Sequence, residues 1–145
     1  MGFLSNLFGS PRPTPVVIIR DRLGREIHRI EGSRDLVGSN LKGLNLAHAD
    51  LVGQSLVGAN CEGTIFVGAR LDRADFSKAS LRRADMYLCS VLGTRFCQAD
   101  MRSASLYKAD VGSKKKPCAD FHEALVDETT DIPGRKYSGT MRVIS

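Results

Sequence analysis

The side chains in this sequence that could do chemistry are three histidines and four cysteines. Nucleophilic catalysis needs a thiol or hydroxyl beside a base, and a zinc site needs cysteines and histidines at short, regular spacings. The histidines lie far apart along the chain, no CxxC pair occurs, and no Cys/His spacing suggests zinc. We therefore predict that the chain has no catalytic residue, no metal site and no cofactor, and that it is not an enzyme.

An apolar residue recurs at every fifth position from Leu36 to Phe121, and Lys116 is the one break. A step of five residues turns an α-helix by roughly 140° and reverses the face of a strand, so neither element could bury these side chains together. A chain that bends once per repeat and winds into a coil would point them all at one axis. The predicted structural core is Leu36, Leu41, Leu46, Leu51, Leu56, Cys61, Phe66, Leu71, Phe76, Leu81, Met86, Val91, Phe96, Met101, Leu106, Val111 and Phe121.

Two further columns of residues accompany the apolar one. From position 49 to 109 the residue two positions before each apolar centre is usually small and most often Ala, which would fill a narrow coil beside the larger residue. Directly before the centre Asn or Asp is common, as at Asn40, Asp75 and Asp100. Both side chains hydrogen-bond nearby backbone at turns, so they suit a chain that bends every few residues.

This pattern resembles the pentapeptide-repeat proteins, whose consensus is Ala-Asp-Leu-x-x. The runs Ala49-Asp50-Leu51, Ala74-Asp75-Phe76 and Ala99-Asp100-Met101 carry the resemblance, which covers about residues 34–126. It implies an all-β fold, a right-handed quadrilateral β-helix with four pentapeptides in each coil and about 4.5 coils in all. Function is left open by the resemblance, because most members of the family have no known activity.

The sequence outside the repeats predicts a cap at each end of this solenoid. The expected division is 1–15 for an apolar tail and Pro-rich linker, 16–33 for a β-hairpin cap, 34–126 for the solenoid and 127–145 for a short C-terminal cap. The hairpin strands are predicted at 16–20 and 26–30. Residues 1–10 could pack on the rod or could touch a partner or a membrane surface.

The cysteine positions and the absence of sorting signals favour a cytoplasmic location. Cys61 and Cys89 take inward positions and Cys97 an outward one, which is typical of reduced thiols rather than of a disulfide framework. The first residues lack a basic segment followed by a long apolar run, and no stretch approaches the ~20 apolar residues of a membrane span.

Residues twenty apart should stack on one face of the rod, and this sorts the outward side chains into columns. One column is apolar for a surface and predicts a protein-binding patch: Val67, Tyr87, Leu88 and Tyr107. The alternative is that the two tyrosines form a ladder that only stabilises adjacent coils. The next column supplies a candidate basic patch of three arginines: Arg82, Arg83 and Arg102. The alternative is that the arginines are solvated and paired with Asp72, Asp75 and Asp85.

The leading functional prediction is a non-enzymatic protein–protein interaction or scaffold module, with an unidentified protein or a second copy as partner, either as a homodimer or end to end. The first alternative is a DNA-mimicking inhibitor or protector of DNA gyrase, a class of the family that is strongly acidic. The net charge of +5 argues against it, because a basic chain presents no phosphate-like field. The second alternative is salt-sensitive binding of nucleic acid or a membrane surface through the basic and N-terminal segments.

Overall fold

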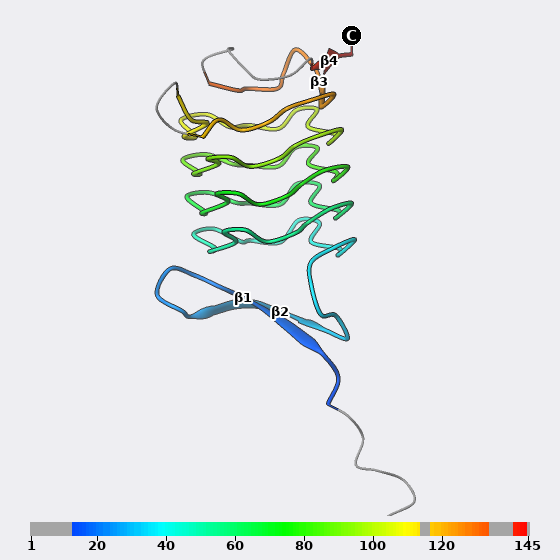
Figure 1. Cartoon of the computed structure of the whole chain (residues 1–145), viewed down its shortest axis with the longest axis vertical. Helices are drawn as coiled ribbons and strands as arrows, with labels where there is room; N and C mark the ends of the chain where they lie inside the picture. Colours follow the sequence, from blue (N-terminus) through cyan, green and yellow to red (C-terminus); the bar gives the residue numbers. More distant parts are fainter. Residues whose placement is uncertain (1–12, 114–116, 134–140, 145) are drawn as a thin grey trace, which may run out of the picture.

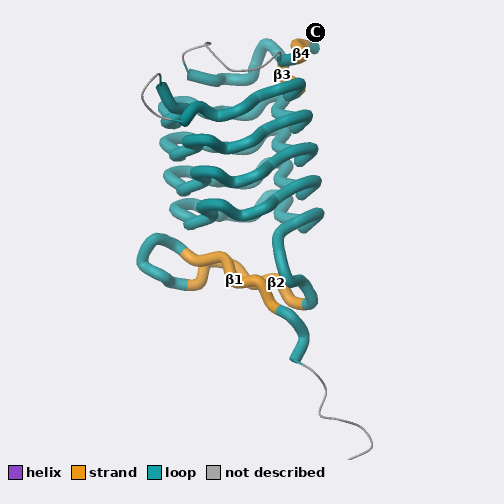
Figure 2. Tube along the Cα trace, in the orientation of Figure 1, coloured by secondary structure: helices purple, strands orange, loops and turns teal. Residues whose placement is uncertain are grey.

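The computed structural model describes residues 13–113, 117–133 and 141–144, which form a β-hairpin followed by a stack of coils (Figure 1). Strands β1 (Val16–Arg20) and β2 (Glu26–Glu31) pair antiparallel. At the other end the short strands β3 (Leu125–Val126) and β4 (Arg142–Val143) pair parallel. The chain between them consists of turns and single β-bridges, drawn as loop in Figure 2, and the described residues contain no helix.

Each coil takes twenty residues. Parallel bridges join residues twenty apart from Asn40 with Asn60 to Ser90 with Asp110. Since the sequence repeats every five residues, a coil has four sides. Backbone hydrogen bonds connect one coil to the next, as from the Leu41 N–H to the Asn60 carbonyl at 2.8 Å. These hydrogen bonds join residues about twenty apart in the sequence. The coils stack because the same type of parallel bridge recurs on each side.

The period-five residues fill the interior of the coils. Those from Leu36 to Leu106, together with Phe121, have at most 2% of their surface exposed, and the small residues two positions earlier are also buried. Aromatic rings stack along the axis, with 5.6 Å between the centroids of Phe76 and Phe96 and 5.1 Å between Phe96 and Phe121. One large and one small inward residue per side therefore pack the rod without a central channel.

The corners of the rod confirm the role predicted for Asn and Asp. Asn45 Oδ1 accepts the Ala47 N–H at 3.1 Å, and Asp85 Oδ1 accepts the Tyr87 N–H at 3.0 Å. The second corner residue adopts a left-handed conformation, which suits glycine but is also taken here by Leu88 with φ 56°. A local side-chain bond thus bends the chain at the start of each corner.

The regular ladder is displaced by five residues after Asp110. Arg95 bridges to Asp120 rather than to residue 115, and the Ala119 N–H donates to the Val111 carbonyl at 3.0 Å. The break in the apolar series that the sequence shows at Lys116 thus coincides with an interruption of the ladder. The insertion is five residues long, as long as one repeat. It therefore leaves the frame of the five-residue period unbroken and cannot be told from a repeat by its length. Val111 is only half-buried at the base of this loop, and Lys116 lies outside the described residues.

Both ends of the stack make backbone contacts with the coils. The Arg20 carbonyl of β1 accepts the Asp50 N–H at 2.8 Å, and Ile19 is buried against the first coil. At the other end the last bridge joins Ser105 to Asp131, so the ladder continues past the predicted solenoid boundary at residue 126. The tail predicted at residues 1–10 lies outside the described part of the chain.

Candidate functional site: a tyrosine patch bordered by arginines

The candidate site lies on the side of the rod whose bridge column runs through Ile65, Asp85 and Ser105. Its apolar residues occur mainly at one corner of that side. We call the set the tyrosine patch: Ile65, Val67, Tyr87, Leu88, Tyr107 and Lys108.

The two tyrosine rings of the patch stack across adjacent coils. The centroids of Tyr87 and Tyr107 lie 6.0 Å apart with 18° between the ring planes, and the Lys108 ammonium lies 5.3 Å from the Tyr107 centroid. Such a stack stabilises adjacent coils by about 0.5–1.5 kcal/mol. The predicted ladder is therefore present. Lys108 was not among the predicted site residues, although its place at the corner column of Leu88 could have indicated it.

Stacking leaves much of the patch open to solvent. Tyr107 is 52% exposed, Leu88 51% and Ile65 38%. Tyr87 and Val67 are half-buried and contribute less surface. The backbone holds these side chains firmly, because the Leu88 N–H donates to the Tyr107 carbonyl at 3.2 Å. The patch is thus a rigid apolar surface that needs little ordering before it binds.

Two exposed arginines border the other corner of this side. Arg83 and Tyr87 are separated only by residues 84–86, which form the flat part of the side. Arg82 and Arg83 make no ion pair within the described residues. Together with Lys42, Arg82 acts on Glu62, whose pKa is lowered mainly by the hydrogen bond from Lys42 and further by the nearby guanidinium. The corner therefore carries positive charge that the rod itself does not neutralise by contact.

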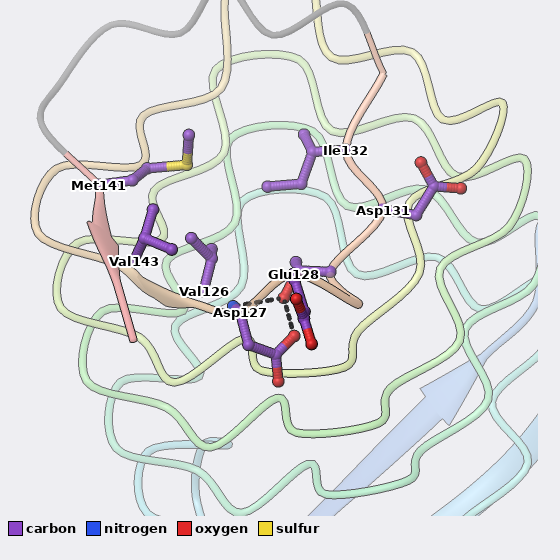
Figure 3. Close-up of a pocket in the computed structure, with 8 residues that line it drawn as sticks. Val126, Asp127, Glu128, Asp131, Ile132, Met141 and Val143 are labelled. Atoms are coloured by element: carbon purple, nitrogen blue, oxygen red, sulfur yellow. Dashed lines mark hydrogen bonds between the residues drawn. The ribbon is translucent and has the colours of Figure 1, made fainter. Parts of the chain in front are cut away.

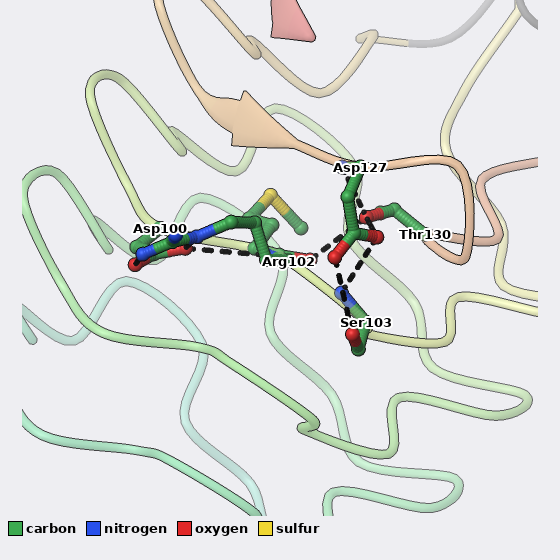
Figure 4. A network of polar contacts seen from close by, with 6 residues as sticks. Asp100, Arg102, Ser103, Asp127 and Thr130 are labelled. Carbon is green, nitrogen blue, oxygen red and sulfur yellow. Dashed lines mark hydrogen bonds and ion pairs between the residues drawn. The ribbon is translucent and has the colours of Figure 1, made fainter. Parts of the chain in front are cut away.

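Arg102 differs from its two predicted companions. Its Nε donates to Asp100 Oδ1 at 2.8 Å, and this hydrogen bond holds the pKa of Asp100 below its ordinary value (Figure 4). Three carboxylates were expected to pair with arginines. One of them, Asp75, pairs with Arg95, with 3.2 Å between Asp75 Oδ2 and a guanidinium nitrogen. Asp72 instead accepts the Leu92 N–H at 3.0 Å. The predicted pairing is wrong for Asp72 because its carboxylate turns toward the backbone of the next coil.

Residues 55–91 match the family model described as pentapeptide repeats (8 copies). The chain carries pentapeptide repeats. Its fold is similar to that of a pentapeptide repeat protein from the Arabidopsis thaliana thylakoid lumen, with 26% identity, a TM-score of 0.55, and coverage of 70% of this chain and 69% of that one. The pentapeptide-repeat architecture is a right-handed quadrilateral β-helix, and the twenty-residue ladder agrees with it.

Two other solved pentapeptide-repeat structures are less similar. HetL, a protein involved in heterocyst differentiation regulation from Nostoc sp. strain PCC 7120, has 20% identity and a TM-score of 0.47 over 66% of this chain and 56% of its own. QnrB1, a plasmid-mediated fluoroquinolone resistance protein, has 18% identity and a TM-score of 0.47 over 69% of this chain and 63% of its own. No curated protein sequence matches the chain significantly.

The end of the pentapeptide rod carries a hollow of about 360 Å³, which is lined both by apolar residues such as Val126 and Ile132 and by the carboxylates of Asp127, Glu128 and Asp131 (Figure 3). Asp127 at its rim accepts bonds from the Ser103 N–H at 3.0 Å and the Thr130 hydroxyl at 2.9 Å. Hydrogen bonds, chiefly from Thr129, hold the pKa of Asp127 well below its ordinary value. This carboxylate therefore fixes the residues after Val126 to the coil below.

The nucleophiles of the pentapeptide rod do not form a reactive site in the described residues. Burial raises the pKa of the Cys61 and Cys89 thiols to about 12. Cys89 Sγ donates to the Phe66 carbonyl at 2.8 Å, and Cys118 is exposed. No group of three or more potential metal ligands occurs in the described ranges, and these ranges hold no helix able to span a membrane.

Proposed function

We propose that the protein is a non-enzymatic interaction module that binds a protein partner through the tyrosine patch. The observation that carries this proposal is the half-exposed Tyr107 and Leu88 pair on a flat, backbone-fixed side of the rod. Exposed aromatic and aliphatic side chains that lie together mark protein interfaces more often than isolated apolar residues do. Comparison with known families indicates no enzymatic family, which supports the non-enzymatic part.

The ends of the rod support its use as a separate module. The hairpin of β1 and β2 bonds to the first coil through the Arg20 carbonyl and the Asp50 N–H, and the residues after Val126 bond to the last through the Asp131 carbonyl and the Leu106 N–H. We infer that these two segments are caps, because an uncovered end of a β-solenoid pairs readily with other chains. A capped rod directs association to its sides.

The test is the double substitution Tyr87→Ser/Tyr107→Ser. The matched control is Val37→Ser/Val57→Ser, which alters the corresponding corner residues on another side of the rod. The native chain and the control should retain a cross-linked partner, in source-cell extract or as a second copy, while the tyrosine variant should lose it. Loss of the stack should lower the free energy of unfolding by about 1 kcal/mol, so the rod stays folded.

Retention of the partner by the folded tyrosine variant would contradict the proposal. Unfolding of that variant alone would show that the stack serves stability. Chemical denaturation followed by circular dichroism separates these results.

A further inference from the structure

We infer that the tyrosine patch receives an acidic segment of a protein, whose carboxylates meet the neighbouring cations and whose apolar side chains meet Leu88 and Tyr107. This inference rests on the function proposed above and adds the chemistry of the partner.

Some cations of the rod are neutralised by a carboxylate of an adjacent coil. Lys42 Nζ lies 3.0 Å from Glu62, and Arg70 lies 2.9 Å from Asp50. Each of these pairs joins residues twenty apart, so the stacking of the coils itself aligns opposite charges. The stacking of the coils thus supplies a partner to some cations, while other cations of the described residues form no salt bridge.

Three cations beside the patch lack such a partner. Arg82, Arg83 and Lys108 are exposed, and none of them makes a salt bridge within the residues that the structure describes. The carboxylate in the same side is Asp85, which is half-buried and accepts the Tyr87 N–H at 3.0 Å. Glu62 and Asp100 also lie near these arginines, but each already has a cation of its own, Lys42 for Glu62 and Arg102 for Asp100. Positive charge therefore remains in excess around the apolar residues.

Other unpaired cations show that charge alone does not define the site. Arg73 and Lys78 are also exposed and have no salt bridge among the described residues. The corner residues next to them are Asp72 and Ser77, which are polar. Around the tyrosine patch, apolar surface and unpaired charge coincide, and an interface commonly combines an apolar centre with a complementary charged rim.

The ring geometry favours a protein over a nucleic acid as the anionic partner. Single-stranded nucleic acid binds by stacking its bases on free aromatic faces. Here the rings of Tyr87 and Tyr107 face each other at 6.0 Å, and the Lys108 ammonium lies 5.9 Å from the Tyr87 centroid and closer to that of Tyr107. Exposed aliphatic residues such as Leu88 offer contact to apolar side chains instead.

The experiment titrates the full chain with three probes and follows backbone amides by NMR. The probes are a peptide of alternating Glu and Phe, its Lys/Phe counterpart, and an oligothymidylate of similar length. The Glu/Phe peptide should shift the amides of Tyr87, Leu88 and Tyr107, and its affinity should fall as salt is added. The Lys/Phe peptide and the oligothymidylate should bind at least about tenfold more weakly.

Two charge-reversal variants complete the test. Arg82→Glu/Arg83→Glu should weaken the Glu/Phe peptide at least about tenfold. The control Arg73→Glu/Lys78→Glu changes the net charge equally, and it alters two residues of left-handed conformation where the first variant alters one, Arg83. It should change the affinity less than about twofold.

Equal weakening by both variants would overturn the inference, because binding would then follow net charge. Stronger binding of the oligothymidylate, or equal binding of the two peptides, would also overturn it. Either failure would leave the proposed interaction function standing if the Tyr87→Ser/Tyr107→Ser variant still loses its partner.

Discussion

The effect of a single side chain is clear at Gly68, where an added Cβ atom would displace the side chain of a neighbouring residue. Its φ of +64° is shared by many corner residues, including Lys78 at 60°. What distinguishes Gly68 is its neighbour, because an added Cβ would lie 2.8 Å from His48 Nδ1. The Gly68 carbonyl also accepts a hydrogen bond from Arg22 of the hairpin at 3.1 Å.

We therefore expect Gly68→Ala to destabilise the rod more than Gly53→Ala. Both substitutions place a Cβ in a left-handed conformation, which costs about 1 kcal/mol. Only Gly68→Ala also displaces the His48 ring, since nothing lies within 4 Å of a Cβ at Gly53. Urea unfolding should show a larger loss for Gly68→Ala, and His48→Ala should remove the difference. Equal losses in the two glycine variants would contradict the steric explanation.

Among structural elements, the loop inserted after Val111 is the most informative. It separates Asp110 from Asp120, yet both residues take the same place in their repeats and both bridge to the coil below. The coils before and after it keep their core stacking, as the 5.1 Å contact of Phe96 with Phe121 shows. An insertion at a corner is tolerated because it lies outside the ladder of backbone hydrogen bonds.

Deletion of residues 112–116 should leave a folded rod. Val111 would then be followed by Pro117, Cys118 and Ala119, which restores a five-residue spacing to Phe121. Closing a loop of this length changes stability by less than about 1 kcal/mol. The control deletion of residues 112–115 moves Phe121 out of frame and should unfold the last coil. Hydrogen exchange would detect that loss, and similar protection in the two deletions would refute the frame argument.

Over the whole molecule, the stacked coils bury thiols that must stay protonated. The folded-state pKa of about 12 for Cys61 and Cys89 lies above the ordinary value of 9.0. Their contribution to stability is therefore complete below pH 9 and is lost as the pH rises toward 12. The lowered pKa values of carboxylates such as Asp75 and Asp100 act in the opposite direction, since their contribution is lost as the pH falls through the acid range.

Alkaline pH should consequently destabilise the rod through these two thiols. At about pH 10 each thiol accounts for a loss of about 1 kcal/mol relative to neutral pH. The variant Cys61→Ala/Cys89→Ala should be less stable at neutral pH, because it leaves cavities, but its stability should depend less on alkaline pH. Guanidinium unfolding at several pH values measures both effects. An unchanged alkaline slope in this variant would show that other groups cause the loss.

The inward and outward directions of the side chains could be read from the sequence, and the structure places them accordingly from Leu36 to Leu106. A period of five is a local property, because each repeat bends at its own corner, and at many corners an Asn or Asp of the same repeat bonds the backbone there. The tyrosine column was predictable for the same reason. The periodicity did not distinguish the half-buried Tyr87 from the exposed Tyr107, because exposure depends on the coil stacked above.

The tertiary structure decided what the period leaves open. It shows that the ladder of bridges skips five residues between Asp110 and Asp120, that Arg102 is paired while Arg82 is not, and that Lys108 lies over the tyrosine rings. These features depend on contacts between coils, where side chains twenty or more residues apart compete for the same neighbours. The sequence alone therefore determined that the chain forms a rod and which side chains point into its core. The packing of one coil on the next determined the surface through which we propose that the rod binds.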